Sequence, residues 1–371
     1  MLVRDRPVLR RERRTSNLLA EILVSSEAAS ALSPGTLDIE NIDTLVPYLR
    51  SHRLIEDAPV ETRVLKGGVS NRTVLVVDRD CAFVVKQALS KLRTAADWFS
   101  DPRRIHTEAL GLRYLEKLAP KGAITPLLFE DRDQHVIAMT AVPEPHDNWK
   151  TLLLNGHLQS SHVEQFAELL AAIHRNSSED PKLADLFADR SFFDTLRLEP
   201  YYRYSAEQVP EAGPFLHKLI EDTWNTRVAL VHGDYSPKNI LVREGRLILL
   251  DHEVVHYGDP AFDVGFALTH FLSKAHHLRH MTLQFGDAAQ SFVARYLEGV
   301  RERPWASGAE SRAVRHTLGC LLARVAGRSP LEYLTDSERR KQSAVALELM
   351  GQAPQHLPEL VSAFIERLIC H

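Results

Sequence analysis

Residues 228–251 have the sequence VALVHGDYSPKNILVREGRLILLD. The apolar runs at the start and near the end of this segment are typical of buried strands. Between them lies Asp234, followed five positions later by Asn239, and Asp251 comes directly after the second run. The pair Glu244-Gly245 predicts a turn that folds Asp251 back beside Asn239. The segment therefore predicts two acids and one amide gathered at the end of a short hairpin.

The spacing of these three polar side chains suits phosphoryl transfer. That chemistry needs a group that orients the attacking hydroxyl, and oxygen ligands that hold Mg²⁺ on the nucleotide phosphates. The order H-x-D-x-x-x-x-N followed by D is that of the catalytic and metal loops of kinases, with Gly233 where protein kinases usually carry Arg. We expect Asp234 to be the catalytic base, or the group that orients the substrate hydroxyl. We expect Asn239 and Asp251 to bind Mg²⁺.

Glu253 lies two positions after Asp251 and projects to the same side if the chain there is extended. Contact with a second Mg²⁺, or with its water, is one interpretation of this residue. A supporting position behind the ligands is an equally good alternative.

A second motif follows the first, and together they resemble the aminoglycoside phosphotransferase-like family of small-molecule kinases. The family pattern H-G-D-x-x-x-x-N … D-x-E … G-D-P-x-F-D is met at His232, Gly233, Asp234, Asn239, Asp251, Glu253, Gly258, Asp259, Pro260, Phe262 and Asp263. The resemblance covers roughly residues 39–345. It implies an α+β, two-lobe protein-kinase-like fold with a five-stranded antiparallel amino-terminal sheet and a mostly helical carboxy-terminal lobe. In the family, Asp263 corresponds to a buried scaffold acid.

We expect three parts along the chain. Residues 1–36 form an N-terminal tail or helix, 37–142 a nucleotide-binding lobe, and 143–371 a helical lobe for catalysis and acceptor binding. The Arg-rich N-terminus lacks the apolar core of a secretory signal, which leaves a solvated tail or an organelle transit peptide.

A Gly-rich turn and a lysine precede the predicted lobe boundary. In the sequence KGGVSN, residues 66–71, the backbone around Gly67, Gly68, Ser70 and Asn71 is predicted to cover nucleotide phosphates, although an ordinary hairpin turn has the same pattern. Lys86 ends an apolar strand and needs a partner if it is buried. Glu108 lies on the apolar face of a helix predicted at 104–118. These two residues match the Lys–Glu pair that positions ATP phosphates in kinases.

The run 135–142 predicts a strand that is ended by prolines. In the resembled fold, backbone groups around Met139 to Ala141 would meet the adenine edge. A plain edge strand is the alternative.

The carboxy-terminal half predicts helices at 161–175, 318–325, 344–350 and 357–369, with Ser161 as an N-cap. Residues 178–226 are interpreted as irregular, with aromatic side chains that form local core or line an acceptor pocket. Arg324 and Arg328 would share a helix face if the helix continues that far, and are candidates to bind an anionic part of the acceptor.

Composition excludes several classes of partner. The chain has 371 residues, 44% hydrophobic and 25% charged, with a formal net charge of −4, so nucleic acid is not expected as a partner. No apolar run is long enough to span a membrane, and a membrane is not expected as a partner. The three separated cysteines, Cys81, Cys320 and Cys370, indicate reduced thiols in a cytoplasmic protein.

The prediction is an ATP- and Mg²⁺-dependent phosphotransferase acting on a small-molecule hydroxyl. A nucleotide-binding pseudokinase with a regulatory role is the alternative. A protein kinase is disfavoured, because Asp251-His252-Glu253 replaces D-F-G and no A-P-E segment follows. Residues 301–341 hold nine Arg or Lys against five Asp or Glu, although the segment 178–226 is rich in acids. This balance weakly favours a neutral or anionic metabolite over a polycationic aminoglycoside. The oligomeric state is not predicted.

Overall fold

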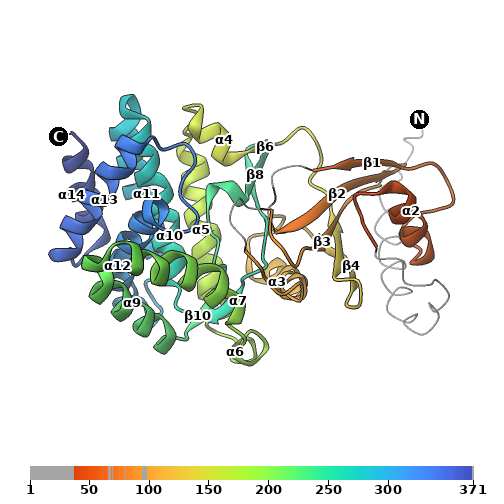
Figure 1. The fold of residues 1–371 in the computed structure, drawn as a ribbon, viewed down its shortest axis with the longest axis horizontal. Helices are drawn as coiled ribbons and strands as arrows, with labels where there is room; N and C mark the ends of the chain where they lie inside the picture. The colour runs from red at the N-terminus through yellow and green to blue at the C-terminus, as the bar shows by residue number, and fades with distance from the viewer. Residues whose placement is uncertain (1–36, 66–67, 69, 80, 94–97, 370–371) are drawn as a thin grey trace, which may run out of the picture.

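A computed structural model of the chain describes residues 37–65, 68, 70–79, 81–93 and 98–369. The N-terminal tail or helix expected at 1–36, and Gly67, lie outside the described residues. The chain forms a sheet-containing part and a larger helical part at opposite ends of an elongated molecule (Figure 1). The α+β fold class predicted from the sequence is confirmed.

The first part is built on a five-stranded antiparallel sheet with the order β1-β2-β3-β5-β4. Its strands are β1 (Glu61–Val64), β2 (Asn71–Asp78), β3 (Cys81–Ala88), β4 (Leu127–Asp131) and β5 (Val136–Thr140). Residues alternate between two faces, so Val136 and Ala138 pack with α2 (Ile42–Ser51), while Ile137 and Met139 pack with α3 (Arg104–Leu118). Lys86 is opposite Ile137 in the register, which places its side chain on the α3 side.

The second part is mostly helical. Its helices are α4 (Trp149–Leu154), α5 (Ser160–Ser177), α6 (Lys182–Leu186), α7 (Ser191–Phe193), η1 (Asp194–Arg203), α8 (Tyr204–Gln208), η2 (Pro210–Ala212), α9 (Gly213–Asn225), η3 (Pro237–Asn239), α10 (Ala261–His277), η4 (Arg279–Met281), α11 (Thr282–Val300), α12 (Ala306–Ala326), α13 (Asp336–Gly351) and α14 (Leu357–Ile369). The helix predicted at 161–175 is α5, but the N-cap at Ser161 is wrong. Helix α5 starts at Ser160 with Gln159 as N-cap and no side-chain cap.

The interpretation of 178–226 as irregular is also wrong, because this segment is largely helical and includes the π-helix η1. Pro200 interrupts the helical pattern in the sequence, and the π-helix accommodates it. The aromatic side chains Phe193, Tyr201 and Tyr202 are buried in the core, as expected from the local-core interpretation.

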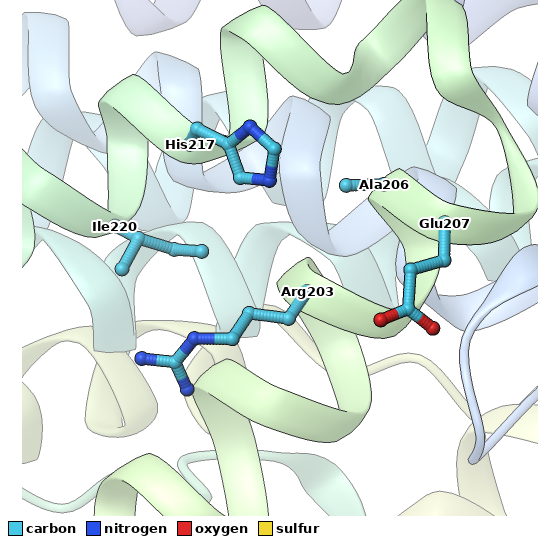
Figure 2. Close-up of a pocket in the computed structure, with 5 residues that line it drawn as sticks. All are labelled: Arg203, Ala206, Glu207, His217 and Ile220. Carbon is cyan, nitrogen blue, oxygen red and sulfur yellow. The ribbon is translucent and has the colours of Figure 1, made fainter.

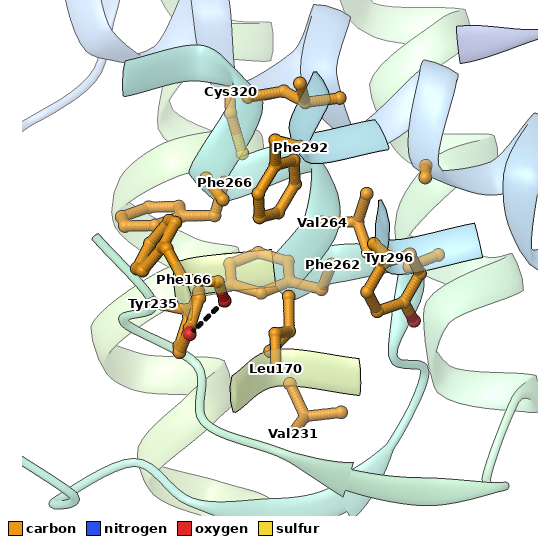
Figure 3. Packing of buried hydrophobic residues seen from close by; sticks show 14 of the residues in the cluster. Phe166, Leu170, Val231, Tyr235, Phe262, Val264, Phe266, Phe292, Tyr296 and Cys320 are labelled. Carbon is orange, nitrogen blue, oxygen red and sulfur yellow. Dashed lines mark hydrogen bonds between the residues drawn. The ribbon is translucent and has the colours of Figure 1, made fainter. Parts of the chain in front are cut away.

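The helical core anchors the segment 228–251. Figure 3 shows Phe166, Tyr235, Phe262 and Phe292 within one apolar cluster. The ring of Tyr235 stacks on that of Phe166, with centroids 4.2 Å apart, and its hydroxyl donates to the Phe166 carbonyl oxygen at 2.6 Å. The residue after Asp234 is therefore held by both packing and a hydrogen bond.

Short strands complete the segment. β7 (Ala229–Val231) pairs with β10 (His256–Gly258), and β8 (Ile240–Arg243) pairs with β9 (Arg246–Leu249), while β6 (Asp147–Asn148) adds to β8. The two apolar runs of the segment are therefore strands of different sheets. None of the described helices is long and apolar enough to cross a membrane.

Candidate active site

The loop after β7 is held by one buried acid. Asp263 on α10 accepts the backbone N–H groups of His232 at 2.6 Å and Gly233 at 2.8 Å, and its Oδ2 lies 3.2 Å from His174 Nε2. Gly233 has φ of +77°, and a Cβ at this position would lie 2.8 Å from Val254 Cγ2. Only glycine fits both the conformation and the space, which accounts for the residue that replaces the Arg of protein kinases.

Replacing Asp263 by alanine should lower the free energy of unfolding by about 2–6 kcal/mol, because each of two buried N–H groups that lose their acceptor costs about 1–3 kcal/mol. Equilibrium urea unfolding measures this. Asp263→Asn keeps one carbonyl oxygen as an acceptor, so its free energy of unfolding should fall by less than that of Asp263→Ala. A free energy of unfolding within about 0.5 kcal/mol of wild type in Asp263→Ala would contradict the scaffold assignment.

The carboxylate of Asp234 is held at one of its two oxygens. Oδ2 accepts from Asn239 Nδ2 at 2.8 Å and lies 3.1 Å from Arg197 Nη2. Among the described residues, Oδ1 has no hydrogen-bond partner. Burial would raise the pKa of Asp234, but the charges of Arg197 and Lys238 and the Asn239 hydrogen bond outweigh it and hold the pKa below its ordinary value. Asp234 is therefore an ionised carboxylate with one fixed and one available oxygen.

Arg197 was missed in the sequence analysis. It lies on η1, and besides contacting Asp234 it donates through Nε to the Gly233 carbonyl oxygen at 2.6 Å. Arg197 and Asp234 are 37 positions apart and meet only through the tertiary fold, so no local spacing in the sequence pointed to this contact. The π-helix itself is a signal of functional sites, but it was not visible in the sequence.

The hairpin brings Asp251 to Asn239 as predicted. Glu244 and Gly245 form the turn with φ values of +52° and +73°, and the Leu250 N–H donates to the Asn239 carbonyl oxygen at 2.9 Å. Asp251 itself has φ of +67°, a left-handed conformation that aspartate adopts more readily than most residues.

Lys86 meets two carboxylates. Its Nζ lies 2.5 Å from Glu108 Oε1 and 4.0 Å from Asp251 Oδ1. Burial would lower the pKa of Lys86, but the charges of Glu108 and Asp251 outweigh it and raise the pKa above its ordinary value. The structure thus brings the predicted Lys–Glu pair next to the end of the hairpin.

Asp251 offers an oxygen that fits a metal. Its Oδ1 is buried and has no hydrogen-bond donor among the described residues, and the Lys86 ammonium lies 4.0 Å from it. A buried carboxylate oxygen without a donor is costly unless a cation completes it. Together with the amide of Asn239, this donor set fits a hard cation such as Mg²⁺.

Glu253 is committed elsewhere at one oxygen. Its Oε2 accepts from Arg104 Nε at 3.1 Å and from Asn71 Nδ2 at 3.3 Å. Arg104 also donates to the backbone carbonyls of Ser70 and Leu89. Glu253 therefore joins the segment that contains Asp251 to the end of the Gly-rich turn and to the start of α3. These contacts favour the interpretation in which Glu253 supports the metal ligands from behind. Arg104 was not singled out from the sequence, although it lies one turn before Glu108 on the same helix face.

The other residues predicted to bind nucleotide lie at or near the ends of strands. Asn71 is buried at the start of β2, Ser70 is buried just before it, and Gly68 is exposed. Met139 is in β5, and the N–H of Ala141 donates to the Ala82 carbonyl oxygen at 3.1 Å. That N–H is therefore engaged within the protein, so an adenine at the end of β5 would meet other backbone groups of the segment. Because β5 lies between β3 and β4, the edge-strand alternative is wrong.

The charge count over 301–341 does not describe the site, because three of its arginines pair with acids of 178–226. Arg303 pairs with Glu179 and Arg315 with Asp222. Helix α12 ends at Ala326, so Arg324 and Arg328 do not share a helix face, and that expectation is wrong.

Arg328 pairs with Glu199 at 3.1 Å and is exposed, whereas Arg324 makes no ion pair with a described carboxylate. A surface hollow in the helical part is lined by Arg203, Ala206, Glu207, His217 and Ile220 and contains none of the predicted site residues (Figure 2).

Comparison with known proteins identifies the family of the chain. A family model described as the phosphotransferase enzyme family matches residues 61–285, more than half of the chain. A methylthioribose kinase of Pectobacterium atrosepticum is 26% identical over 265 residues, which are 62% of this chain and 64% of the relative. A methylthioribose kinase of Pectobacterium carotovorum is 27% identical over 220 residues, 51% of this chain and 53% of the relative. The chain thus spans less than two thirds of the length of these curated relatives.

Two solved structures share the fold. An amicoumacin kinase, hAmiN, in complex with AMP-PNP, Ca²⁺ and Ami, has a TM-score of 0.51 and 13% identity, covering 84% of this chain and 94% of its own. A protein of Ralstonia eutropha, described provisionally as an aminoglycoside phosphotransferase, has a TM-score of 0.50 and 14% identity, covering 89% and 98%. At this identity the likeness establishes the architecture.

Proposed function

The chain belongs to the phosphotransferase enzyme family, as the resemblance implied, and we propose that it transfers the terminal phosphoryl group of ATP to a hydroxyl of a small molecule, with Mg²⁺ as the metal. The observation that carries the proposal is the meeting of Asp234, Asn239, Asp251 and Lys86 at the end of one hairpin. A regulatory module that only binds nucleotide has no need of all four, so the enzyme is favoured over the pseudokinase.

Each residue has a role in this proposal. The free Oδ1 of Asp234 accepts the hydrogen bond of the acceptor hydroxyl and aligns it for attack. Asn239 and Asp251 would hold Mg²⁺, which when bound neutralises charge on the phosphates. Glu253 stays a predicted ligand of a second ion or of its water through Oε1, while its Oε2 supports the site. Lys86, oriented by Glu108, would contact the phosphates.

The nucleotide is proposed to lie between the sheet and the helical part, within the predicted lobe 37–142. Gly67, Gly68, Ser70 and Asn71 would cover the phosphates, and the segment from Met139 to Ala141 would line the base. Residues 143–371 would supply catalysis and acceptor binding. We also propose a cytoplasmic location, because Cys81 and Cys320 are free thiols. Neither nucleic acid nor a membrane is proposed as a partner.

The acceptor is proposed to be a neutral or anionic hydroxylated metabolite. The test is ADP release from MgATP in the presence of single compounds from a panel of sugars, sugar acids, hydroxy acids and aminoglycosides, with methylthioribose included because relatives carry its name. We expect ADP release with a neutral or anionic compound. ADP release only with aminoglycosides would overturn the acceptor proposal. If no compound of the panel supports release of a nucleoside diphosphate, with ATP or with another nucleotide, the result would count against the kinase itself.

Removing Lys86 should abolish the stabilisation of the protein by MgATP. Nucleotide at about 100 times its dissociation constant stabilises a native protein by about 2.7 kcal/mol, which appears as a rise in melting temperature. Lys86→Met removes the ammonium that would contact the phosphates, so the rise should shrink or vanish. Lys182→Met, on an exposed lysine of α6, is the matched control and should keep it. An equal rise in wild type and Lys86→Met would place the nucleotide elsewhere.

A further inference from the structure

A buried lysine in the helical part has no acid to balance it. Lys274 on α10 is 0% exposed, and its hydrogen bond goes to the carbonyl oxygen of His270, one turn earlier, at 3.4 Å. Its Nζ also lies 5.5 Å from the centre of the Tyr333 ring. None of the described carboxylates forms an ion pair with it. Burial, with the nearby charges of Lys150 and Arg324, lowers the pKa of Lys274 to about 7.

Arg324 on α12 is partly buried and also lacks an acid partner among the described residues. Its Nη1 donates to the hydroxyl of Tyr201 at 3.0 Å and to the carbonyl oxygen of Ser329 at 2.6 Å. Its Nε is buried without a partner, and no described carboxylate pairs with it. The other arginines named above in 301–341 pair with acids, so Arg324 differs from them in this respect.

The nearby acid is already taken. Glu332 pairs with Lys150 on α4, and its pKa is lowered because that hydrogen bond and the charges of Lys150 and Arg324 outweigh its burial. His270 has a buried Nε2 without a hydrogen-bond partner among the described residues, and the charges of Lys274 and Arg324 are near enough to lower its pKa. We call Lys150, His270, Lys274 and Arg324 the basic cluster. Three basic side chains of the cluster, Lys150, Lys274 and Arg324, share the one carboxylate of Glu332, so the cluster lacks negative charge.

The basic cluster borders the catalytic loop. Arg324 and Arg197 both face the ring of Tyr201, with their guanidinium carbons 5.7 Å and 5.9 Å from its centre, and Arg197 contacts Asp234. On the other side, α4 packs against η3, and Asn148 Nδ2 donates to the carbonyl oxygen of Lys238 at 2.7 Å. The cluster is therefore placed where a molecule with its hydroxyl at Asp234 would extend into the helical part.

We propose that the basic cluster binds an anionic group, a carboxylate or a phosphate, carried by the hydroxylated acceptor. The proposal rests on the function proposed above and narrows its acceptor from neutral or anionic to anionic. The guanidinium of Arg324 supplies parallel donors for a planar or tetrahedral oxyanion, and Lys274 supplies a point charge. An anion there would complete donors that are now buried without partners, which offsets the cost of burying them.

Simple anions test the cluster without knowledge of the acceptor. The full chain, with Mg²⁺ and AMP-PNP present to occupy the nucleotide site, is titrated with malonate in one arm and inorganic phosphate in another. NaCl at matched ionic strength corrects for screening. We expect a saturable rise in melting temperature in at least one arm, since an anion that binds only the native state stabilises it. The arm with the larger rise tells carboxylate from phosphate.

Two variants attribute the effect to the cluster. Arg324→Gln should lose the anion-dependent rise, while Arg328→Gln should retain it, because Arg328 is exposed and paired with Glu199. Lys274→Met should lose the rise as well, yet melt no lower than wild type without anion, since it replaces an unbalanced buried charge by an apolar side chain of similar length. A lysine with a purely structural role would instead lower the melting temperature when removed.

The proposal is overturned if wild type shows no saturable rise with either anion, or if Arg324→Gln shows the same rise as wild type. Its failure is separable from that of the proposed function. The titration is repeated without nucleotide, where the difference between wild type and Arg324→Gln should persist. Loss of the AMP-PNP-dependent rise alone would count against the kinase and leave the anion site standing.

Discussion

Replacing Asp234 by alanine should reduce the turnover number by about two orders of magnitude or more, with nucleotide affinity within a few-fold of wild type. A positioned base contributes about 10²–10⁴-fold to such reactions. Asp234 contacts Asn239 and Arg197 through Oδ2, and among the described residues it forms no ion pair with Lys86. The loss should therefore fall on turnover rather than on nucleotide binding. ADP release and nucleotide titration measure the two separately.

Controls are needed because Asp234 balances the buried charge of Arg197. Asp234→Asn retains an oxygen that can accept from Asn239 or Arg197, so it should fold like wild type and still lose the turnover. Asp287→Ala, on an exposed carboxylate of α11, is the matched surface change and should keep full activity. A folded Asp234→Ala protein that turns over at nearly the wild-type rate would exclude Asp234 from catalysis.

The parts of the site that could be predicted from sequence are those set by local geometry. Asp251 comes beside Asn239 because a two-residue turn with positive φ values closes one hairpin. Lys86 faces α3 because residues of a strand alternate between two faces, and Glu108 is on the buried face because helix residues repeat every three to four positions. In each case the position of the side chain follows from a turn or from a strand or helix period that can be read in the sequence.

The parts that could not be predicted depend on how distant elements pack. Arg197 reaches Asp234 only because η1 lies against the catalytic loop, and Arg104 meets Glu253 across 149 positions. Charge counts failed for the same reason. The basic excess of 301–341 and the acids of 178–226 were weighed separately as indications of the charge of the acceptor, but Arg303 and Arg315 neutralise Glu179 and Asp222 directly. That Arg324 lacks a carboxylate partner among the described residues can be recognised only after the pairing is known.

Replacing Arg197 by methionine should shift the acid side of the pH–rate profile to higher pH by about 1–3 units, the usual effect of an arginine beside an aspartate. In the wild type, burial raises the pKa of Asp234 but Arg197, the strongest opposing influence, brings it below its ordinary value. Without Arg197 the largest influence that opposes burial is gone, so the pKa of Asp234 rises and it keeps its proton to higher pH. The reaction needs the ionised form, so activity should be lost at a higher pH than in the wild type. Turnover at neutral pH should also fall, by up to about 100-fold, since the carboxylate loses its orientation.

The same experiment distinguishes positioning from a merely structural role. Arg197→Lys keeps the charge but not the donor to the Gly233 carbonyl oxygen, so its acid limb should lie close to that of wild type while its turnover is only partly restored. Arg203→Met, on the same π-helix and paired with Asp194 at 2.7 Å, is the matched control and should leave the profile in place. If Arg197→Met folds, binds nucleotide and shows an unchanged acid limb, the ionisation of Asp234 does not depend on Arg197. The arginine would then serve only to join η1 to the catalytic loop, because a lost structural contact lowers stability at every pH but does not move the pKa of the base.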